Sequence, residues 1–258
     1  MAALSTPTVW NVPFTFSHPA AVVPLLRVGL VPSALVIGSM APDVPYYLPG
    51  SPISSAHTHS LLGVVAADLA LGAILFVVWH ALLAPAAVAL APTALRDRLA
   101  PDLPVPLRRH TAWLVLVSLA VGALTHVVWD AFTHPGRWGS ERIGWLNEEH
   151  GPLLGTTWLQ HGSGGLGLLV LLGVLARWWW RTPPQPGRQR VPALDRPTAL
   201  RVIAAVLAAG ALGGLAGLLT ADGTLFGLLF RSFTWGCGAA AAAWVVLAAM
   251  VRTRAAPS

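Results

Sequence analysis

Residues Ala112–Pro135, AWLVLVSLAVGALTHVVWDAFTHP, combine a long apolar run with three polar side chains near its end. The run Ala112–Trp129 has roughly the length that a helix needs to cross a bilayer core about 30 Å thick. His126, Asp130 and His134 recur every four residues, so on a helix they form one stripe that advances about 40° per step. Ionisable groups are costly in a membrane and usually functional there. The stretch therefore predicts a spanning helix that ends in a metal site, although such residues can also simply close a helix bundle.

The composition is that of a membrane protein. Hydrophobic residues make up 55% of the 258 residues and charged residues only 10%, and the mean hydropathy is +0.66. A soluble chain of this length would carry far more charge. The apolar runs predict an all-α polytopic helical membrane protein with about five spanning helices: Leu61–Ala84, Ala112–Trp129, Gly164–Trp180, Val202–Leu219 and Ser232–Val251.

A further apolar region, Ala20–Pro42, precedes these spans. It contains Pro24, Gly29 and Pro32, and proline and glycine interrupt a straight helix. We expect this N-terminal region to form a broken or re-entrant helical segment, although a single crossing is the alternative. Only if the segment enters and returns do His18 and Asp43 lie on the same side of the membrane as the end of the 112–129 span.

The distribution of the arginines predicts how the protein is oriented in the membrane. The chain has no lysine, and twelve of its sixteen arginines lie in the linkers 85–111 and 177–201 or in the C-terminal tail. Basic loops stay on the cytoplasmic side, so these loops and the C-terminus are expected to be cytoplasmic and the His/Asp residues extracytoplasmic. In a membrane protein, basic residues serve first to set the orientation in the lipid bilayer, which is the expected partner. Nucleic-acid binding is therefore not expected. A single cysteine excludes a disulfide framework and a cysteine-rich metal site.

Three regions are expected along the chain. Residues 1–181 form the membrane domain with the His/Asp motifs, residues 182–197 an Arg/Pro-rich flexible cytoplasmic linker, and residues 198–258 a C-terminal helical hairpin. Glycines at spacings of three and four within 210–217 predict a close approach of two helices.

The residue before a proline is disfavoured in helical geometry. His134 precedes Pro135, and on a straight helix it would lie roughly 12 Å from His126, too far for a common metal ion with bonds of about 2 Å. We therefore expect His134 to leave the helix and fold back toward Asp130.

Two more histidines precede the span that begins at Leu61. His57 and His59 alternate like ligands on an extended segment, and Thr58 or Ser60 can cap the following helix. Asp68 is expected to be a buried helix contact or a partner of a ligand, and His80 a packing or interfacial residue. On the N-terminal side, Asp43 stands between Pro42 and Pro45, a rigid placement that suits a ligand; a simple turn residue is the alternative.

The loop 136–162 adds acids, histidines and interfacial tryptophans. Glu148 or Glu149 could serve as general base toward water activated by a metal ion. A solvated acidic turn is the other interpretation of both glutamates. Trp138, Trp145 and Trp158 suit a lid at the membrane interface.

Four motifs together resemble a bacterial membrane family known as domain of unknown function 4184. They are Phe14-Thr15-Phe16-Ser17-His18-Pro19-Ala20, Ile37-Gly38-Ser39-Met40-Ala41-Pro42-Asp43, His57-Thr58-His59-Ser60-Leu61-Leu62-Gly63 and His126-Val127-Val128-Trp129-Asp130-Ala131-Phe132-Thr133-His134. The resemblance implies a location in the bacterial cytoplasmic membrane. More distantly, the same order is similar to membrane-bound metal-dependent hydrolases. That likeness implies a metal site made of His18, Asp43, His59, His126 and Asp130, while the absence of a tight acidic cluster after Asp43 is a departure from it.

The resulting hypothesis is a metal-dependent hydrolase that acts on a lipid-linked or envelope-derived substrate. The ligand candidates would hold one or two divalent ions, with zinc expected and manganese or iron as alternatives. His57 and His134 would be further ligands or orienting residues. The alternative is a non-enzymatic transporter or assembly factor that uses the His and Asp groups for ion or proton binding, and Asp68 and His80 inside a span would favour it.

Overall fold

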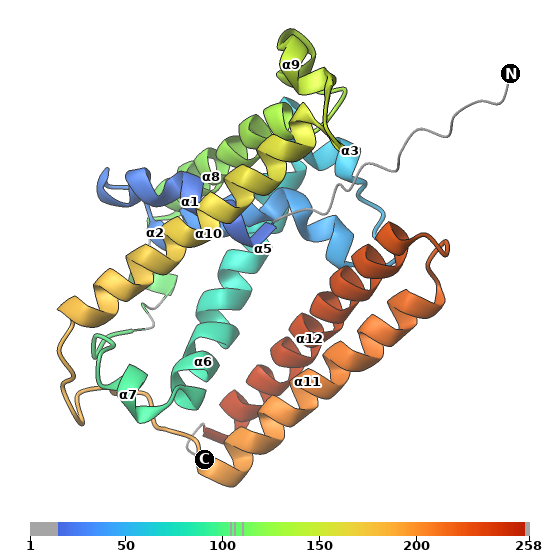
Figure 1. The fold of residues 1–258 in the computed structure, drawn as a ribbon. Helices are drawn as coiled ribbons and strands as arrows, with labels where there is room; N and C mark the ends of the chain where they lie inside the picture. The colour runs from blue at the N-terminus through green and yellow to red at the C-terminus, as the bar shows by residue number, and fades with distance from the viewer. Residues whose placement is uncertain (1–14, 104, 106, 110, 256–258) are drawn as a thin grey trace, which may run out of the picture.

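The computed structural model describes residues 15–103, 105, 107–109 and 111–255; Phe14 of the first motif lies outside them. The chain is 75% helical with almost no strand, which confirms the predicted all-α fold (Figure 1). The α-helices are α1 Pro19–Val22, α2 Pro32–Met40, α3 Ser55–Thr58, α4 Leu61–Val65, α5 Ala67–Val78, α6 Ala84–Leu90, α7 Thr93–Arg96, α8 Ala112–Thr133, α9 Gly144–Asn147, α10 Gly155–Arg181, α11 Arg196–Leu219 and α12 Leu225–Ala255. Two short antiparallel strands, β1 Glu149–His150 and β2 Leu153–Leu154, follow α9.

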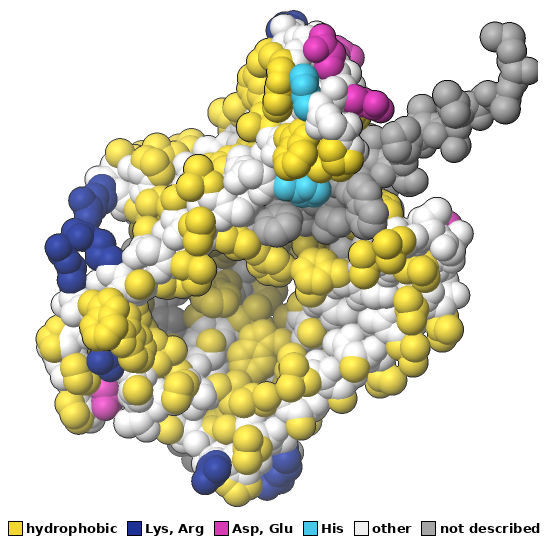
Figure 2. All heavy atoms as spheres, viewed as in Figure 1, with side chains coloured by type: hydrophobic (Ala, Val, Ile, Leu, Met, Phe, Trp, Pro, Cys, Tyr) yellow, Lys and Arg dark blue, Asp and Glu magenta, His cyan; other side chains and the backbone are white. Residues whose placement is uncertain are grey.

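Five segments within the described residues are long and apolar enough to cross a membrane, as predicted. They are Ala67–Leu90, Ala112–Thr133, Gly155–Arg181, Arg196–Leu219 and Leu225–Val251. Their outward faces carry leucines that suit lipid contact, and Figure 2 shows apolar side chains over the long helices.

The first predicted span, Leu61–Ala84, has the wrong boundaries. Ser60 caps α4, since its Oγ accepts from the Gly63 N–H at 2.9 Å, and the backbone then breaks at Ala66 with φ −118° and ψ −87°. The spanning segment begins only at Ala67 and continues through a π-helical turn into α6. The turn lies just before Pro85, which lacks the N–H that a regular helix needs. Apolar periodicity alone does not reveal such a break.

The region 20–42 enters the bundle and returns without crossing it. The short helix α1 and the 3-10 turn Val23–Arg27 lead to a bend at Gly29, where φ is +82°. Helix α2 then runs back over nine residues, too few to cross a bilayer core of about 30 Å. The predicted re-entrant arrangement therefore places His18 and Asp43 at the same end of the bundle.

Two glycines let α2 and α8 pack with their backbones in contact. A Cβ at Gly38 would lie 2.2 Å from the Leu119 carbonyl oxygen, and one at Gly122 would lie 2.3 Å from the Leu35 carbonyl oxygen. Only glycine fits at these two positions. The close contact of α2 with α8 therefore fixes the position of the 39–43 segment relative to the polar end of α8.

Gly122→Ala is therefore expected to destabilise the protein by about 1–3 kcal/mol, because the added methyl group must push α2 away from α8. The thermal unfolding midpoint in detergent measures the change. Gly173→Ala is the matched control, since a Cβ at this position of α10 meets nothing within 4 Å; it should leave the midpoint unchanged or raise it slightly. Equal midpoints for the two variants would contradict the close packing.

Helices α11 and α12 pack against each other as a hairpin and are joined by a short turn. A Cβ at Gly213 would meet the Trp235 carbonyl oxygen at 2.6 Å, and one at Gly217 would meet that of Arg231 at 2.3 Å. Small residues thus allow the close approach expected from their spacing. In Figure 1 this hairpin (orange to red) lies beside α6 and the π-helical turn that precedes it, while α10 runs along the other side.

Candidate metal centre

Four buried side chains from three separate segments meet at one point. Asp43 lies in the 3-10 turn Ala41–Tyr47, His59 directly follows α3, and His126 and Asp130 lie one turn apart on α8. One potential ligand atom of each lies within 4.8 Å of the others. Two of the three segments are held together by the glycine contact between α2 and α8. The cluster could hold a metal ion.

The distances between these atoms suit a small cation with short bonds. His59 Nε2 lies 3.3 Å from Asp43 Oδ1, 3.2 Å from Asp130 Oδ2 and 3.2 Å from His126 Nε2. His126 Nε2 lies 3.4 Å from Asp43 Oδ1 and 3.5 Å from Asp130 Oδ2. Ligands bonded at 2.0–2.1 Å to a tetrahedral ion lie about 3.3–3.4 Å apart. These five distances therefore match five of the six edges of such a tetrahedron.

Both cluster imidazoles are oriented by backbone carbonyl groups. His126 Nδ1 lies 2.8 Å from the Ser39 carbonyl oxygen, and His59 Nδ1 lies 2.9 Å from that of Ser55. A carbonyl oxygen only accepts, so each Nδ1 carries the proton and, in a neutral ring, each Nε2 presents a lone pair. Lone pairs of two imidazoles and two carboxylates thus face one another. A proton or a metal ion must lie among them to offset their repulsion.

The pKa shifts of Asp43 and His59, which lie outside the spanning segments, also indicate a site that attracts a cation. Burial would raise the pKa of Asp43, but the neighbouring His126 and His59 imidazoles outweigh it and hold the pKa well below its ordinary value. Burial opposes the charge of His59, but hydrogen bonds to Asp130 and Asp43 outweigh it and raise the pKa. The cluster therefore attracts positive charge, and a metal ion would have to displace protons to bind.

His18 and His134 flank the cluster on the side of Asp130 Oδ1. His18 Nε2 and His134 Nδ1 each lie 3.6 Å from this oxygen. The His18 ring stacks on that of His126 with centroids 3.7 Å apart, and burial together with His126 lowers the pKa of His18 to about 3. His134 has the extended backbone predicted from Pro135, with φ −122° and ψ 139°, and burial lowers its pKa.

His57 is not part of this group. The segment Ser55–Thr58 forms a helical turn where the sequence predicted an extended alternation, so His57 and His59 point in different directions. His57 is exposed, and its Nδ1 lies 2.6 Å from the Ser54 hydroxyl. The expectation that both histidines face one site is wrong for His57.

Glu148 and Glu149 are exposed at the junction of α9 and β1. Figures 1 and 2 show α9 projecting beyond the end of the bundle, with acidic side chains on the projection. Both residues lie outside the group of ligand atoms within 4.8 Å. The predicted role of either as general base therefore has no contact to support it among the described residues.

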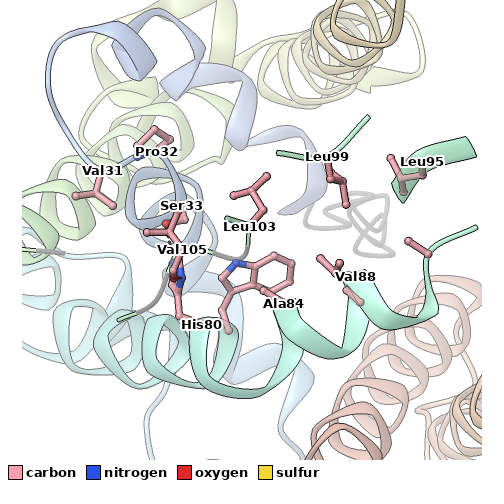
Figure 3. Close-up of a pocket in the computed structure, with 13 residues that line it drawn as sticks. Val31, Pro32, Ser33, His80, Ala84, Val88, Leu95, Leu99, Leu103 and Val105 are labelled. Atoms are coloured by element: carbon pink, nitrogen blue, oxygen red, sulfur yellow. Dashed lines mark hydrogen bonds between the residues drawn. The ribbon is translucent and has the colours of Figure 1, made fainter. Parts of the chain in front are cut away.

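Asp68 and His80 lie inside the first span and outside the cluster, although Asp68 is near enough to interact electrostatically with His59, His126 and Asp43. Asp68 is 1% exposed, and its carboxylate oxygens accept no hydrogen bond from the described residues; its burial fits the expected helix contact, and a hydrogen bond to a ligand is not seen among these residues. His80 contacts the Ser33 hydroxyl through Nε2 at 2.9 Å and the Val105 carbonyl through Nδ1 at 3.0 Å. Figure 3 shows His80 beside these two residues at the wall of an apolar cavity of about 460 Å³. The expected packing role of His80 fits this position.

Sequence reasoning missed two polar side chains next to Asp43. The Thr15 hydroxyl donates to Asp43 Oδ2 at 2.5 Å, and the Tyr47 hydroxyl donates to Thr15 Oγ1 at 2.8 Å. Burial raises the pKa of Tyr47 to about 12, so its hydroxyl remains a donor. The sequence gives little signal: Thr15 belongs to the motif that carries His18, and Tyr47 lies four residues after the motif that ends at Asp43.

Thr15→Val should weaken divalent-metal binding roughly 10- to 100-fold, because partners that orient a ligating carboxylate have effects of this size. Valine keeps the shape of threonine but removes the donor to Asp43 Oδ2. Titration with zinc against a competing chelator measures the affinity, and Thr15→Ser, which keeps the hydroxyl, is the control. Equal affinities for the valine and serine variants would rule out this role.

Comparison with known proteins agrees with the motif order. The comparison with curated proteins and the comparison with solved structures gave no match. A family model, by contrast, matches residues 12–251, which include all the spanning helices and the complete cluster. The chain therefore belongs to the family described as domain of unknown function (DUF4184).

Proposed function

We propose that this protein is a membrane-embedded metal-dependent hydrolase whose His/Asp cluster holds a divalent cation, with zinc favoured over manganese and iron. The observation that carries the proposal is the convergence of four buried lone-pair-bearing atoms from Asp43, His59, His126 and Asp130. Oxygen and imidazole ligands suit all three metals, and the short distances between the ligand atoms favour zinc. The distant likeness of the motifs to membrane-bound metal-dependent hydrolases agrees with this choice.

In this proposal the cation supplies the chemistry, and neighbouring residues orient its ligands. A divalent cation would polarise a phosphoryl or acyl oxygen and lower the pKa of water to about 7. The Ser39 and Ser55 carbonyl groups keep Nε2 of both cluster histidines directed inward, and the Thr15 hydroxyl orients Asp43. These contacts hold the ligands in place before a cation binds, which favours tight binding.

The surroundings favour a lipid-linked or envelope-derived substrate with an anionic group. A cavity of about 300 Å³ lies between the 45–55 segment and α12, and Tyr46, Ser55 and Arg231 are among its lining residues. It adjoins the cluster, because the Ser55 carbonyl contacts His59 and the Tyr46 ring centroid lies 6.1 Å from that of His59. The guanidinium group of Arg231 suits a phosphate or carboxylate.

The cluster lies at the end of the bundle opposite α7 and the C-terminus (Figure 1). Figure 2 shows arginines at the left edge and at the bottom of the molecule, with a smaller patch at its top. If the arginine-rich loops are cytoplasmic, the site opens on the extracytoplasmic side of a bacterial cytoplasmic membrane, where lipid-linked and envelope substrates are found.

The proposal is tested with protein purified in detergent and assayed with zinc or manganese on bis(p-nitrophenyl) phosphate, p-nitrophenyl butyrate and phospholipid micelles. We expect metal-dependent turnover of at least one ester by the wild type and none by Asp43→Asn. Arg231→Leu should raise KM for an anionic substrate and leave KM for the uncharged butyrate ester unchanged. Wild-type protein that binds metal but hydrolyses none of these esters would refute the hydrolase and favour an ion-transporting or assembly role.

A further inference from the structure

The apolar cavity beside His80 is large enough for part of a lipid. Its volume of about 460 Å³ lies within the range of roughly 300–1,000 Å³ that is typical of ligand sites. One wall is the first span with His80 and Val88, and another is the loop after α7 with Leu99 and Leu103. Figure 3 shows these two leucines across the cavity from the helix that carries His80 and Val88. The re-entrant segment contributes only the start of α2 to the lining, so it does not fill this space.

The cavity extends over the depth of one leaflet. His80 precedes the end of the first span at Leu90 by ten residues, which correspond to about 15 Å along a helix. The hydrocarbon core of a bilayer is about 30 Å thick, so this distance is about half of it. Apart from Ser33 and His80, which contact each other at 2.9 Å, the lining side chains are apolar. The cavity therefore has the depth and the lining that suit one acyl chain.

A second, polar cavity of about 350 Å³ adjoins the apolar one. Leu99 and Leu103 line both of them. The polar cavity is also lined by Arg98, Arg188 and Trp178, and no aspartate or glutamate is among its described lining residues. Helix α10 ends here, and tryptophans at the end of a spanning helix lie at the level of the lipid headgroups. The two cavities together thus run from the headgroup level into the apolar half of the membrane.

The guanidinium group of Arg98 is placed to bind an anion. It lies over the Trp179 ring, 4.0 Å from the centroid, and one terminal nitrogen donates to a backbone carbonyl of α7 at 2.8 Å. Its Nε is buried and has no hydrogen-bond partner among the described residues. In this part of the chain neither Asp97 nor Asp102 forms an ion pair with Arg98, and Asp102 pairs with Arg109 instead at 3.5 Å. Because a buried donor without a partner is costly, an anionic oxygen would stabilise this arrangement.

Hydrogen bonds hold the second arginine close to the first. The Gln185 N–H donates to the Asp97 carbonyl at 2.5 Å, and the Gln189 side-chain amide donates to the Ala100 carbonyl at 3.1 Å. These contacts fix the segment that follows α10 against the loop that follows α7. The Arg188 guanidinium donates to the Gln185 side-chain oxygen, and its other N–H groups remain for a ligand. Two guanidinium groups at one cavity suit a phosphate, which accepts several charge-assisted hydrogen bonds.

We propose that one anionic phospholipid occupies both cavities, with its phosphate group on Arg98 and Arg188 and one acyl chain in the apolar cavity beside His80. The two arginines and the lack of a lining carboxylate favour a negatively charged headgroup over a zwitterionic one. The lipid fills the half of the membrane that the re-entrant segment leaves open. This inference does not depend on the proposed hydrolase, because the His/Asp cluster lies at the opposite end of the bundle (Figure 1).

Lipid binding to the purified full-length protein tests the assignment. Delipidated protein in an uncharged detergent is mixed with phosphatidylglycerol or with phosphatidylcholine of the same acyl chains, and native mass spectrometry counts the bound lipids. We expect one phosphatidylglycerol per chain, bound roughly tenfold more tightly than phosphatidylcholine, and a higher thermal unfolding midpoint. The variant Arg98→Gln/Arg188→Gln should lose this preference. Arg177→Gln is the matched control, because Arg177 is exposed near the end of α10 and does not line the cavity.

A second pair of variants tests the acyl chain. Ala87 lines the apolar cavity, so Ala87→Phe should exclude the chain and weaken the binding of both lipids. Ala176→Phe, at an exposed position of α10, should bind phosphatidylglycerol as the wild type does. The arginine variants remain informative even if the larger side chain impairs folding, because they replace side chains that are partly or fully exposed.

Three results would overturn the lipid site. The first is equal binding of the two lipids by the wild type, and the second is an unchanged preference in Arg98→Gln/Arg188→Gln. The third is a midpoint that inorganic phosphate alone raises as much as phosphatidylglycerol does, which would indicate a site for a free anion. Normal phosphatidylglycerol binding by folded Ala87→Phe would likewise contradict the placement of the acyl chain and with it the proposal.

Discussion

Asp130→Asn is expected to abolish tight divalent-metal binding, lowering the metal content from the wild-type value to near zero. Asp130 contributes one oxygen to the cluster with His59 and His126 and the other to His18 and His134. An amide has the shape of the carboxylate but carries no charge, so the negative charge that attracts a cation is halved at the cluster. Because Asp130 lies within 3.6 Å of His18, His59, His126 and His134, no other single change should have a larger effect.

The chain offers a closely matched control in Asp68→Asn. Asp68 is as deeply buried as Asp130, at 1% against 6% exposure, and lies in a helix of the same bundle, but it lies outside the cluster. Elemental analysis after purification without added metal should show normal content for Asp68→Asn. Equal metal content in Asp130→Asn and the wild type would remove Asp130 from the ligand set.

Removal of the metal should lower the thermal stability of the protein strongly. A ligand that binds only the folded state adds about 2.7 kcal/mol at a free concentration of 100 times Kd and about 4.1 kcal/mol at 1,000 times Kd. Without a cation, the buried carboxylates of Asp43 and Asp130 and the imidazoles around them must be held together by protons alone. We therefore expect a chelator to lower the unfolding midpoint by several degrees, and zinc to restore it.

Variants separate metal loss from a general effect of the chelator. Asp43→Asn should unfold at the same temperature with and without zinc, because it lacks one of the four ligand atoms. Asp68→Asn and His57→Ala should keep the zinc-dependent shift. A wild-type midpoint that is insensitive to both chelator and zinc would mean that the cluster is held by protons and hydrogen bonds and serves only to lock the bundle.

Much of the fold could be predicted because it depends on local properties. Apolar length predicted five spans, and pre-proline sterics predicted that His134 leaves the helix. Glycine spacing predicted the close contact of α11 and α12, and Ser60 was one of two candidates for the cap of α4. The break at Ala66 could not be predicted, because the apolar pattern continues through it.

The candidate site also combines features that the sequence predicts with features that only the structure shows. The sequence alone determined the kind of ligands and the stripe of His126 and Asp130, since residues four apart on a helix share a face. Only the tertiary structure decided that His59 and not His57 joins the cluster, that Thr15 supports Asp43, and that the two oxygens of Asp130 face different histidines. The physical reason is that these relations depend on contacts between distant segments, such as the hydrogen bond from His126 to Ser39 across 87 residues, which no local pattern encodes.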